Sequence, residues 1–525
     1  MTLSKGINAS TATMTKLRTP ESYCAFSGMC TTCLDGCPGF CEIGKSAVRG
    51  KEVLYPQPFG KTTSASQKDY PIDYSHFNIM GTAVGAHGIE ADPDKAIFPA
   101  VNLETCLGSN KDLKLTLPII VAAMGSTNVA ADNWDHLAAG CAIAGAGIAI
   151  GENVCAMDPN VEIKNGRVVH SPNLARRVKD FQAWSQGAGF IAVQANVEDT
   201  KLGVQEYALE KLGVDAVEVK WGQGAKDIGG EVKLNSLERA LQLKSRGYIV
   251  LPDPEDAKVQ EAYKAGAFKE FERHSRIGMV SEESFVKRVE ELRAAGAKYV
   301  FLKTGAYRPA DLARAVKFAS LAKIDLLTVD GAGGGTGMSP WRMMNEWGVP
   351  TVYLQSLLTQ YCDKLAARGE YVPPIAMAGG FTLEDHLYKG MALGAPYVKA
   401  IGMARSALTA AMVGKNIGEM VKSGKIPNEY KKYGETLEQI FINTAVLKNK
   451  LGDRFADLPV GAIGVYTYFE RLAQGLRQFM CGARKFSLEY ITRDDLVALT
   501  PEAAGISGIR YVMEADADEV AKILG

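Results

Sequence analysis

The sequence lacks a net charge, a long apolar run and an apolar leader, and it has few histidines. Lys+Arg and Asp+Glu both number 59, so no basic field is present to attract nucleic acid or an anionic membrane. No stretch approaches the roughly 20 apolar residues of a membrane-spanning helix, and the polar start has no signal-peptide core. The six histidines show no paired metal spacing. We therefore expect a cytoplasmic protein with no nucleic-acid or membrane partner.

Cysteine is concentrated near the start of the chain, where five of the ten lie in the 18 residues from Cys24 to Cys41. Clustered cysteines in a cytoplasmic protein bind metal or do redox chemistry more often than they form disulfides. The Cys-x2-Cys-x3-Cys-x3-Cys spacing, with Pro38 after the third cysteine, is close to that of iron–sulfur proteins. Structural zinc and redox-active or free thiols are the alternatives. We predict an iron–sulfur cluster, with 4Fe–4S the favoured type, on Cys30, Cys33, Cys37 and Cys41; Cys24 is the spare or an alternative ligand.

The composition and hydrophobic pattern change along the chain, and these changes predict four parts. Residues 1–70, rich in Cys, Gly, Pro and Ser, form the predicted iron–sulfur module, and residues 71–115 form an irregular connecting segment. Residues 116–415 alternate short apolar runs with amphipathic helical patterns, and residues 416–525 form a helical C-terminal extension.

Eight short apolar runs lie in the third part. Apolar runs bounded by loops and separated by helices indicate buried parallel strands. Eight such units predict an α/β fold of the (β/α)8 TIM-barrel class, and a doubly wound open sheet is the alternative. The runs are Leu117–Ala123, Ala146–Ile150, Phe190–Gln194, Ala216–Lys220, Tyr299–Lys303, Asp325–Asp330, Ile375–Ala378 and Tyr397–Ile401.

The unit after the fourth run is long, at residues 221–297, and we expect it to form an insertion over the barrel mouth. It contains Arg273, His274 and Arg276, which could bind a substrate carboxylate or form a solvated basic loop.

Polar side chains and glycines gather where the predicted strands end, which is the face of a barrel that carries chemistry. Glu218 and Lys220 are two residues apart on one strand and therefore share its face. Lys303 ends the next strand. Because lysine is rarely buried without a partner, these cations either hold an anionic ligand or form an internal ion pair.

Four stretches resemble the FMN-binding synthase domain of the glutamate synthase family, and most closely its stand-alone, archaeal-type members. They are EVKWGQGAK at 218–226 with Gly229–Gly230, VDGAGGGTGMSP at 329–340, Ala123–Gly125 with Gly151–Glu152, and Lys303. The likeness runs from about residue 95 to about residue 480. It implies an FMN-dependent oxidoreductase acting on CH–NH2 donors, in which hydride passes to 2-iminoglutarate, formed from 2-oxoglutarate and ammonia.

The resemblance also implies site residues. Glu218 and Lys303 are the implied catalytic residues near the reactive side of FMN. The phosphate would lie near Gly379, Gly380, Gly402 and Met403, and the isoalloxazine over the loop that follows the first strand. The full set of implied cofactor contacts is Ala122, Ala123, Met124, Gly125, Glu152, Gln194, Lys220, Lys303, Asp330, Gly333, Gly334, Gly335, Gly379, Gly380, Gly402 and Met403.

The sequence departs from the family in ways that bear on partners. The family's 3Fe–4S loop is expected just after the last strand, but Met403–Met412 contains no cysteine, and we find no glutaminase or nicotinamide domain. We therefore expect electrons to enter at the N-terminal cysteines from ferredoxin or another electron-transfer subunit. Ammonia would come from solution or a glutaminase partner, and we expect a homo-oligomer. The alternatives are an FMN-dependent oxidoreductase of another small 2-hydroxy or amino acid, and a flavin/iron–sulfur electron-transfer subunit of a larger complex.

Overall fold

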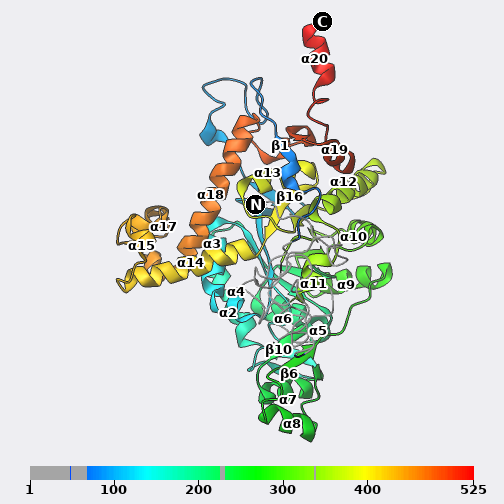
Figure 1. Ribbon diagram of the computed structural model, residues 1–525, viewed down its shortest axis with the longest axis vertical. Coiled ribbons are helices and arrows are strands. Elements are labelled where there is room, and N and C mark those ends of the chain that lie inside the picture. The colour runs from blue at the N-terminus through cyan, green and yellow to red at the C-terminus, as the bar shows by residue number, and fades with distance from the viewer. Residues whose placement is uncertain (1–47, 49–67, 225–230, 336–338) are drawn as a thin grey trace, which may run out of the picture.

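A computed structural model of the chain describes residues 48, 68–224, 231–335 and 339–525 (Figure 1). Eight parallel strands form a closed barrel at its centre, which confirms the predicted (β/α)8 class and excludes the open sheet. The ring closes where the last strand pairs with the first, with Gly402 opposite Ile120. In chain order the strands are β4 (Ile119–Met124), β5 (Gly147–Ile150), β8 (Phe190–Ala195), β9 (Ala216–Lys220), β13 (Tyr299–Thr304), β14 (Leu326–Asp330), β15 (Ile375–Ala378) and β16 (Val398–Met403).

Helices surround the barrel because each one buries an apolar stripe against the outward-facing strand residues. In strand β13, for example, Val300 and Leu302 face outward and pack in this layer between the strands and the helices. The helices are α2 (Asn128–Asp132), α3 (Trp134–Ala144), α4 (Pro172–Gln182), α5 (Val197–Lys201), α6 (Val204–Leu212), α9 (Glu282–Ala294), α10 (Pro309–Leu321), α11 (Trp341–Glu346), α12 (Thr351–Ala367), α13 (Glu384–Leu393) and α14 (Arg405–Lys422).

The inside of the barrel changes from apolar to polar along the strands. Tyr299 and Phe301 belong to an apolar cluster inside the barrel, where Phe301 meets Phe190 edge to face at 5.1 Å between ring centroids. Lys303 follows on the same face, because alternate strand residues share a face. The polar ends of the strands therefore sit above a packed apolar floor.

The segment before the barrel is more ordered than the irregular chain predicted for 71–115. A hairpin of β2 (Thr105–Leu107) and β3 (Leu113–Leu115) packs its leucines into the apolar cluster inside the barrel. Strand β1 (Phe77–Ile79) pairs with β17 (Leu496–Ala498) near the C-terminus. Strands of three residues give too short a sequence pattern to be predicted.

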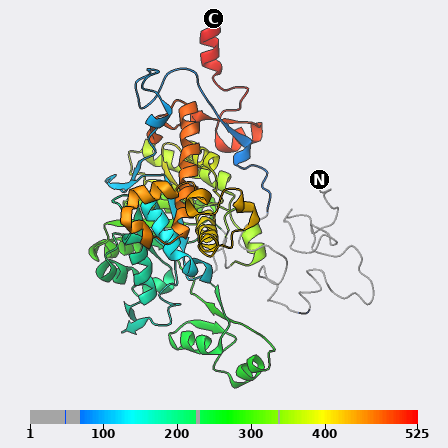
Figure 2. The same ribbon diagram turned by 90° about the vertical axis from the view of Figure 1, so that its left-hand side faces the viewer.

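The insertion after β9 forms a small α/β unit that projects from the lower end of the molecule in both views (Figures 1 and 2). Its three antiparallel strands lie in the order β10-β12-β11. Its own core includes Phe271 and Leu243, and Ala156 from the loop after β5 joins it. The elements are β10 (Glu231–Leu234), α7 (Leu237–Ser245), β11 (Ile249–Leu251), α8 (Ala257–Lys264) and β12 (Phe271–His274). A hairpin of β6 (Glu162–Lys164) and β7 (Arg167–His170) lies between β5 and α4.

The C-terminal part is mostly helical, and helix α14 runs across the expected boundary at residue 416. Helix α18 (Gly461–Gly482) packs against α14 and α3. Glycines allow the close approach, since a Cβ on Gly464 would lie 2.8 Å from the Gly414 Cα. None of the helices in the described ranges is long and apolar enough to cross a membrane. The remaining helices are α15 (Asn428–Lys431), α16 (Leu437–Ile440), α17 (Thr444–Leu451), α19 (Pro501–Ser507) and α20 (Ala517–Leu524).

The leucines of the β2–β3 hairpin should stabilise the barrel. We expect Leu115→Ala, at a fully buried position, to lower the free energy of unfolding by about 2–5 kcal/mol, because it removes apolar contacts and leaves a cavity. Lys114→Ala in the same strand, at a side chain 48% exposed, should change it by less than about 1 kcal/mol. Urea unfolding followed by circular dichroism measures both, and equal effects would show that the hairpin is not part of the core.

Candidate functional site

The inner carboxylate of the barrel mouth is Glu218, on β9. It is 4% exposed, and its Oε1 accepts a hydrogen bond of 2.6 Å from Gln194 Nε2 on β8. Burial raises the pKa of Glu218, while the nearby Lys303 and the Gln194 hydrogen bond act to lower it. The net effect is a raised pKa, which suits a carboxyl group that takes up and releases a proton.

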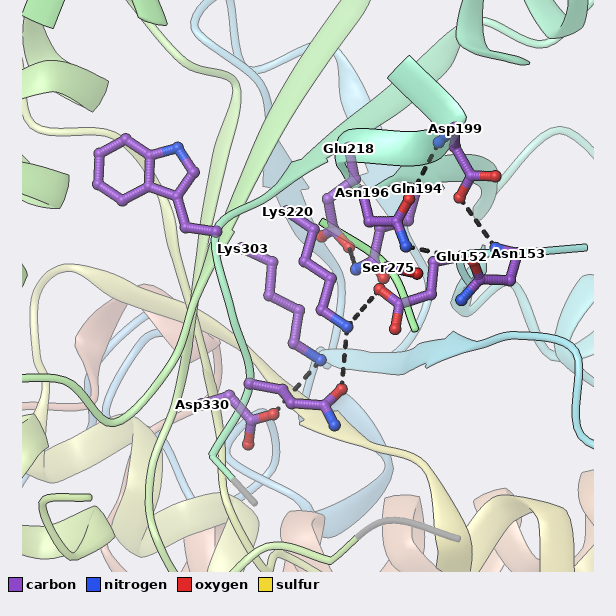
Figure 3. A network of polar contacts seen from close by, with 12 residues as sticks. Glu152, Asn153, Gln194, Asn196, Asp199, Glu218, Lys220, Ser275, Lys303 and Asp330 are labelled. Atoms are coloured by element: carbon purple, nitrogen blue, oxygen red, sulfur yellow. Dashed lines mark hydrogen bonds and ion pairs between the residues drawn. The ribbon is translucent and has the colours of Figure 1, made fainter. Parts of the chain in front are cut away.

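Two lysines stand beside this carboxylate, each paired with an acid from another strand end (Figure 3). Lys303 Nζ lies 3.3 Å from Asp330 Oδ2. Lys220 pairs with Glu152 and donates a 3.0 Å hydrogen bond to Gln223 Oε1. Burial acts to lower the pKa of Lys303, but the charges of Asp330 and Glu218 outweigh it and the pKa is raised. Lys303 is therefore a buried, permanently charged cation at neutral pH.

A cavity lies between these polar groups and the apolar floor of the barrel. Small residues form one wall of it, so the space is not filled by side chains. Glu218, Lys303 and Thr328 line its polar side. The other lining residues are Ile120, Ala122, Ala123, Ala149, Phe190, Phe301, Leu326 and Gly402. The structure thus brings the two predicted catalytic residues together with three of the predicted cofactor contacts.

Glycines after β14 and β15 form a second feature of the mouth. Gly333, Gly379 and Gly380 have φ angles of +114°, +126° and +108°, a region that side-chain-bearing residues rarely adopt. A Cβ on Gly379 would lie 2.5 Å from Thr351 Oγ1, while one on Gly380 would lie 3.4 Å from the Gly333 carbonyl oxygen. These backbones therefore approach one another closely. We call the three residues Gly333, Gly379 and Gly380 the glycine cradle, because closely spaced backbone amides of this kind can bind an anionic group.

Not every residue predicted for the phosphate region faces the mouth with its side chain. Met403 is buried in the outer core, with its sulfur 3.8 Å from the Tyr468 hydroxyl. Only its backbone is available to a ligand on the inner side. Gly334 lies against the cradle, since a Cβ there would be 3.4 Å from the Gly379 Cα, whereas Gly335 is exposed at the edge of the described chain.

The loops after β4 and β5 pack together through their backbones. The Gly151 amide donates a 2.9 Å hydrogen bond to the Met124 carbonyl, and a Cβ on Gly125 would lie 2.3 Å from the Glu152 carbonyl oxygen. Arg177 fixes the first of these loops, because its Nη1 donates to the carbonyls of Met124 at 3.3 Å and Gly125 at 2.9 Å.

Arg177 was not predicted from the sequence. It is fully buried, stacks over Trp134 at 4.9 Å, and burial lowers its pKa to about 10. The sequence feature that could have identified it is its position on helix α4, where it lies on the same apolar face as Leu174, Val178 and Phe181. A lone arginine on the apolar face of an amphipathic helix indicates a buried, bonded cation.

The insertion meets the mouth through a polar joint. Arg273 donates from Nη1 and Nη2 to Asn153 Oδ1, each at 3.0 Å, and Arg276 pairs with Glu198 at 2.9 Å. His274 lies 3.4 Å from Glu272. The two arginines considered for a substrate carboxylate therefore have partners within the chain. Asn153 also was not predicted, although it directly follows the predicted Glu152.

The predicted metal ligands Cys30, Cys33, Cys37 and Cys41 lie outside the described residues, so the iron–sulfur cluster stays a prediction. The cysteines that the structure does describe are dispersed: Cys106, Cys141, Cys155, Cys362 and Cys481. In the described part of the chain no three His, Cys, Asp or Glu side chains gather as a metal site.

Asp199, on α5, should make stability depend on pH. Its Oδ2 accepts a 2.8 Å hydrogen bond from the Asn153 amide, and burial raises its pKa to about 7. The folded state therefore holds a proton that the unfolded state releases near pH 4, so the contribution of Asp199 to wild-type stability falls as the pH rises from about 4 to 7. Asp199→Asn cannot ionise. We expect its melting temperature relative to wild type to rise between pH 5 and pH 7.5, and a constant difference would contradict the raised pKa.

Comparison with known proteins found one family model and several solved structures that resemble the chain. No curated protein matches the chain. Among solved structures, it is similar to a double mutant of flavocytochrome b2 with pyruvate bound (TM-score 0.45, 14% identity, 81% of this chain and 76% of that chain). It is also similar to a soluble mutant of the membrane-associated (S)-mandelate dehydrogenase from Pseudomonas putida (TM-score 0.41, 12% identity, 81% and 88%).

A family model described as the conserved region in glutamate synthase matches residues 273–415, from strand β12 into helix α14. This stretch contains Lys303, Asp330 and the glycines of the cradle. The match thus spans the last four strands of the barrel, β13 to β16.

Proposed function

We propose that the chain is an FMN-dependent oxidoreductase of the glutamate synthase type. The observation that carries this proposal is the meeting of Glu218 with Lys303, itself paired with Asp330, at a cavity with small residues on one wall. Lys303 and Asp330 both belong to the matched region. A buried acid beside a permanent cation can handle a proton and an anionic group in one place.

The residues present fit an FMN. Glycines 333, 379 and 380 follow two neighbouring strands and have φ angles that favour glycine, so their backbone groups, with no side chain in the way, could approach a phosphate. Lys303 would supply a cation for the edge of the ring that becomes anionic on reduction, and Ala122, Ala123 and Gly125 of the partly exposed loop after β4 would leave space beside it. When bound, FMN would supply the hydride that the chain itself cannot.

The proposed substrate is 2-iminoglutarate, formed from 2-oxoglutarate and ammonia with loss of water. Its reduction to glutamate takes up two electrons and two protons. Glu218 is the proposed proton donor and acceptor, because its pKa is raised and Gln194 fixes its orientation. Lys220, held by Glu152 and Gln223 at the outer part of the mouth, is the proposed partner of a substrate carboxylate.

We also propose that electrons reach this site from the N-terminal cysteines. Two described residues that follow them in the chain support this: Lys68 Nζ is 2.5 Å from Glu346 of α11, and a Cβ on Gly333 would be 3.6 Å from the Tyr70 ring. The donor would be ferredoxin or another electron-transfer subunit, and ammonia would come from solution or a glutaminase partner.

The proposal predicts a flavin- and iron-containing protein that makes glutamate. Protein purified without oxygen should contain about one FMN per chain and bound iron. It should convert 2-oxoglutarate and 15N-ammonium into 15N-glutamate when chemically reduced ferredoxin is supplied, as followed by mass spectrometry. Protein that contains no flavin and takes up none on addition of FMN would contradict the proposal. Turnover of a 2-hydroxy acid in place of these substrates would favour the alternative oxidoreductase.

Lys303 should be needed for the reaction, beyond the stability that its buried pair with Asp330 gives the mouth. We expect Lys303→Gln to lower glutamate formation by a factor of about 100 or more, because a preorganised charge at the reacting centre is lost. Lys298→Gln, five residues earlier and 56% exposed, is the matched control and should keep nearly full activity. Initial rates and FMN titrations on both variants make the comparison. Near-normal activity of Lys303→Gln would remove this residue from the reaction.

A further inference from the structure

We propose that Arg273, carried by the insertion, is a positioning residue for the reaction at the mouth. It acts through Asn153 on the loop after β5, and so on the pair that Glu152 makes with Lys220. This inference rests on the function proposed above. It gives the insertion, which contributes none of the groups lining the cavity, a defined role in the site.

Arg273 makes an unusually directed contact for a buried cation. It is 0% exposed, and both terminal nitrogens lie 3.0 Å from Asn153 Oδ1. Nη2 also donates to Ser275 Oγ at 2.9 Å, and the guanidinium stacks on Tyr248 at 4.8 Å. Burying a charge is costly unless it is bonded, and here both donors converge on one neutral amide oxygen. Arg273 therefore fixes the position of Asn153 by hydrogen bonds to a neutral amide oxygen.

Asn153 has a backbone conformation that few residues other than glycine, asparagine and aspartate adopt. Its φ is +66°, in the left-handed region. Its Oδ1 also receives a 3.3 Å hydrogen bond from Asn196, and its amide donates to Asp199 at 2.8 Å. Contacts from Arg273 of β12, from Asn196 at the end of β8 and from Asp199 of α5 thus converge on this one residue, and Figure 3 shows the last two.

The conformation of Asn153 determines where its neighbour Glu152 lies. The Glu152 carboxylate pairs with Lys220, and its carbonyl packs against Gly125 so closely that no Cβ would fit. The Gly151 amide bonds to the Met124 carbonyl. A movement of Asn153 would therefore displace both the cation at Lys220 and the loop proposed to lie under the flavin.

The second attachment of the insertion provides a matched control. Arg276 pairs with Glu198 of α5 at 2.9 Å, and its side chain is 42% exposed. This pair joins the same segment to the same rim, but within the described residues Arg276 hydrogen-bonds to Glu198 and not to the loop after β5. Loss of the Arg276 pair therefore reports on attachment alone, whereas loss of Arg273 reports on attachment and positioning.

The test compares Arg273→Met and Asn153→Gly with Arg276→Gln in the full chain with FMN bound. Glycine tolerates the left-handed φ, so Asn153→Gly removes the bridge without adding backbone strain. We expect both bridge variants to shift the visible flavin spectrum and to lower kcat at least tenfold with a smaller change in KM. Arg276→Gln should keep the wild-type spectrum and kcat within about twofold.

Hydrogen exchange on the same proteins separates this inference from the proposed function, because it needs neither substrate nor turnover. Residues 151–157 should exchange at least tenfold faster in the two bridge variants and at the wild-type rate in Arg276→Gln. If Arg273→Met does not fold, the comparison of Asn153→Gly with Arg276→Gln is sufficient to test the inference. Wild-type protection in Asn153→Gly, or equal loss of protection in Arg276→Gln, would overturn the inference even if the chain makes glutamate. Faster exchange confined to the bridge variants would support it even if the substrate is a different acid.

Discussion

Charge buried at the mouth of the barrel is the constraint on which the rest of the structure depends. Lys303 and Glu218 are each almost wholly buried, and the low dielectric there makes an unpaired charge costly. Asp330 and Gln194 balance them from neighbouring strands, which fixes the relative positions of four strand ends. A barrel whose strands had a different register would leave these groups unpaired.

The same constraint organises the layers around the mouth. Below it, an apolar floor excludes water and so strengthens the interactions among the charges. Beside it, two buried arginines hold the loops in place. Arg177 donates to the carbonyls of Met124 and Gly125 in the loop after β4, and Arg273 donates to Asn153 in the loop after β5. The loops after β4 and β5 are therefore supported by buried cations on their outer side, while the mouth itself stays lined by glycine, alanine and the Glu152–Lys220 pair. This division leaves the inner side available to a ligand.

The sequence predicted the barrel because its eight strands are buried on both faces and read as continuous apolar runs. It also singled out Glu218, Lys220 and Lys303 as charged residues that end apolar strands, and both lysines have the internal acidic partners that were the alternative to an anionic ligand. It could not predict their partners, because pairs such as Lys220 with Glu152 join strands 68 residues apart. Arg273 and Asn153 were missed as a pair for the same reason, and the short strands of the hairpin gave no period to read. The cysteine cluster, the strongest local signal, falls outside the described residues.

An experimental structure of the protein with FMN bound tests the central claim most directly. The account predicts the phosphate at the backbone of Gly379 and Gly380, the ring beside Ala122–Gly125, and the Lys303 ammonium in contact with the ring edge, with Glu218 facing the same side. Density for FMN elsewhere on the chain, or a mouth that stays closed by the Lys303–Asp330 pair at saturating FMN, would contradict it.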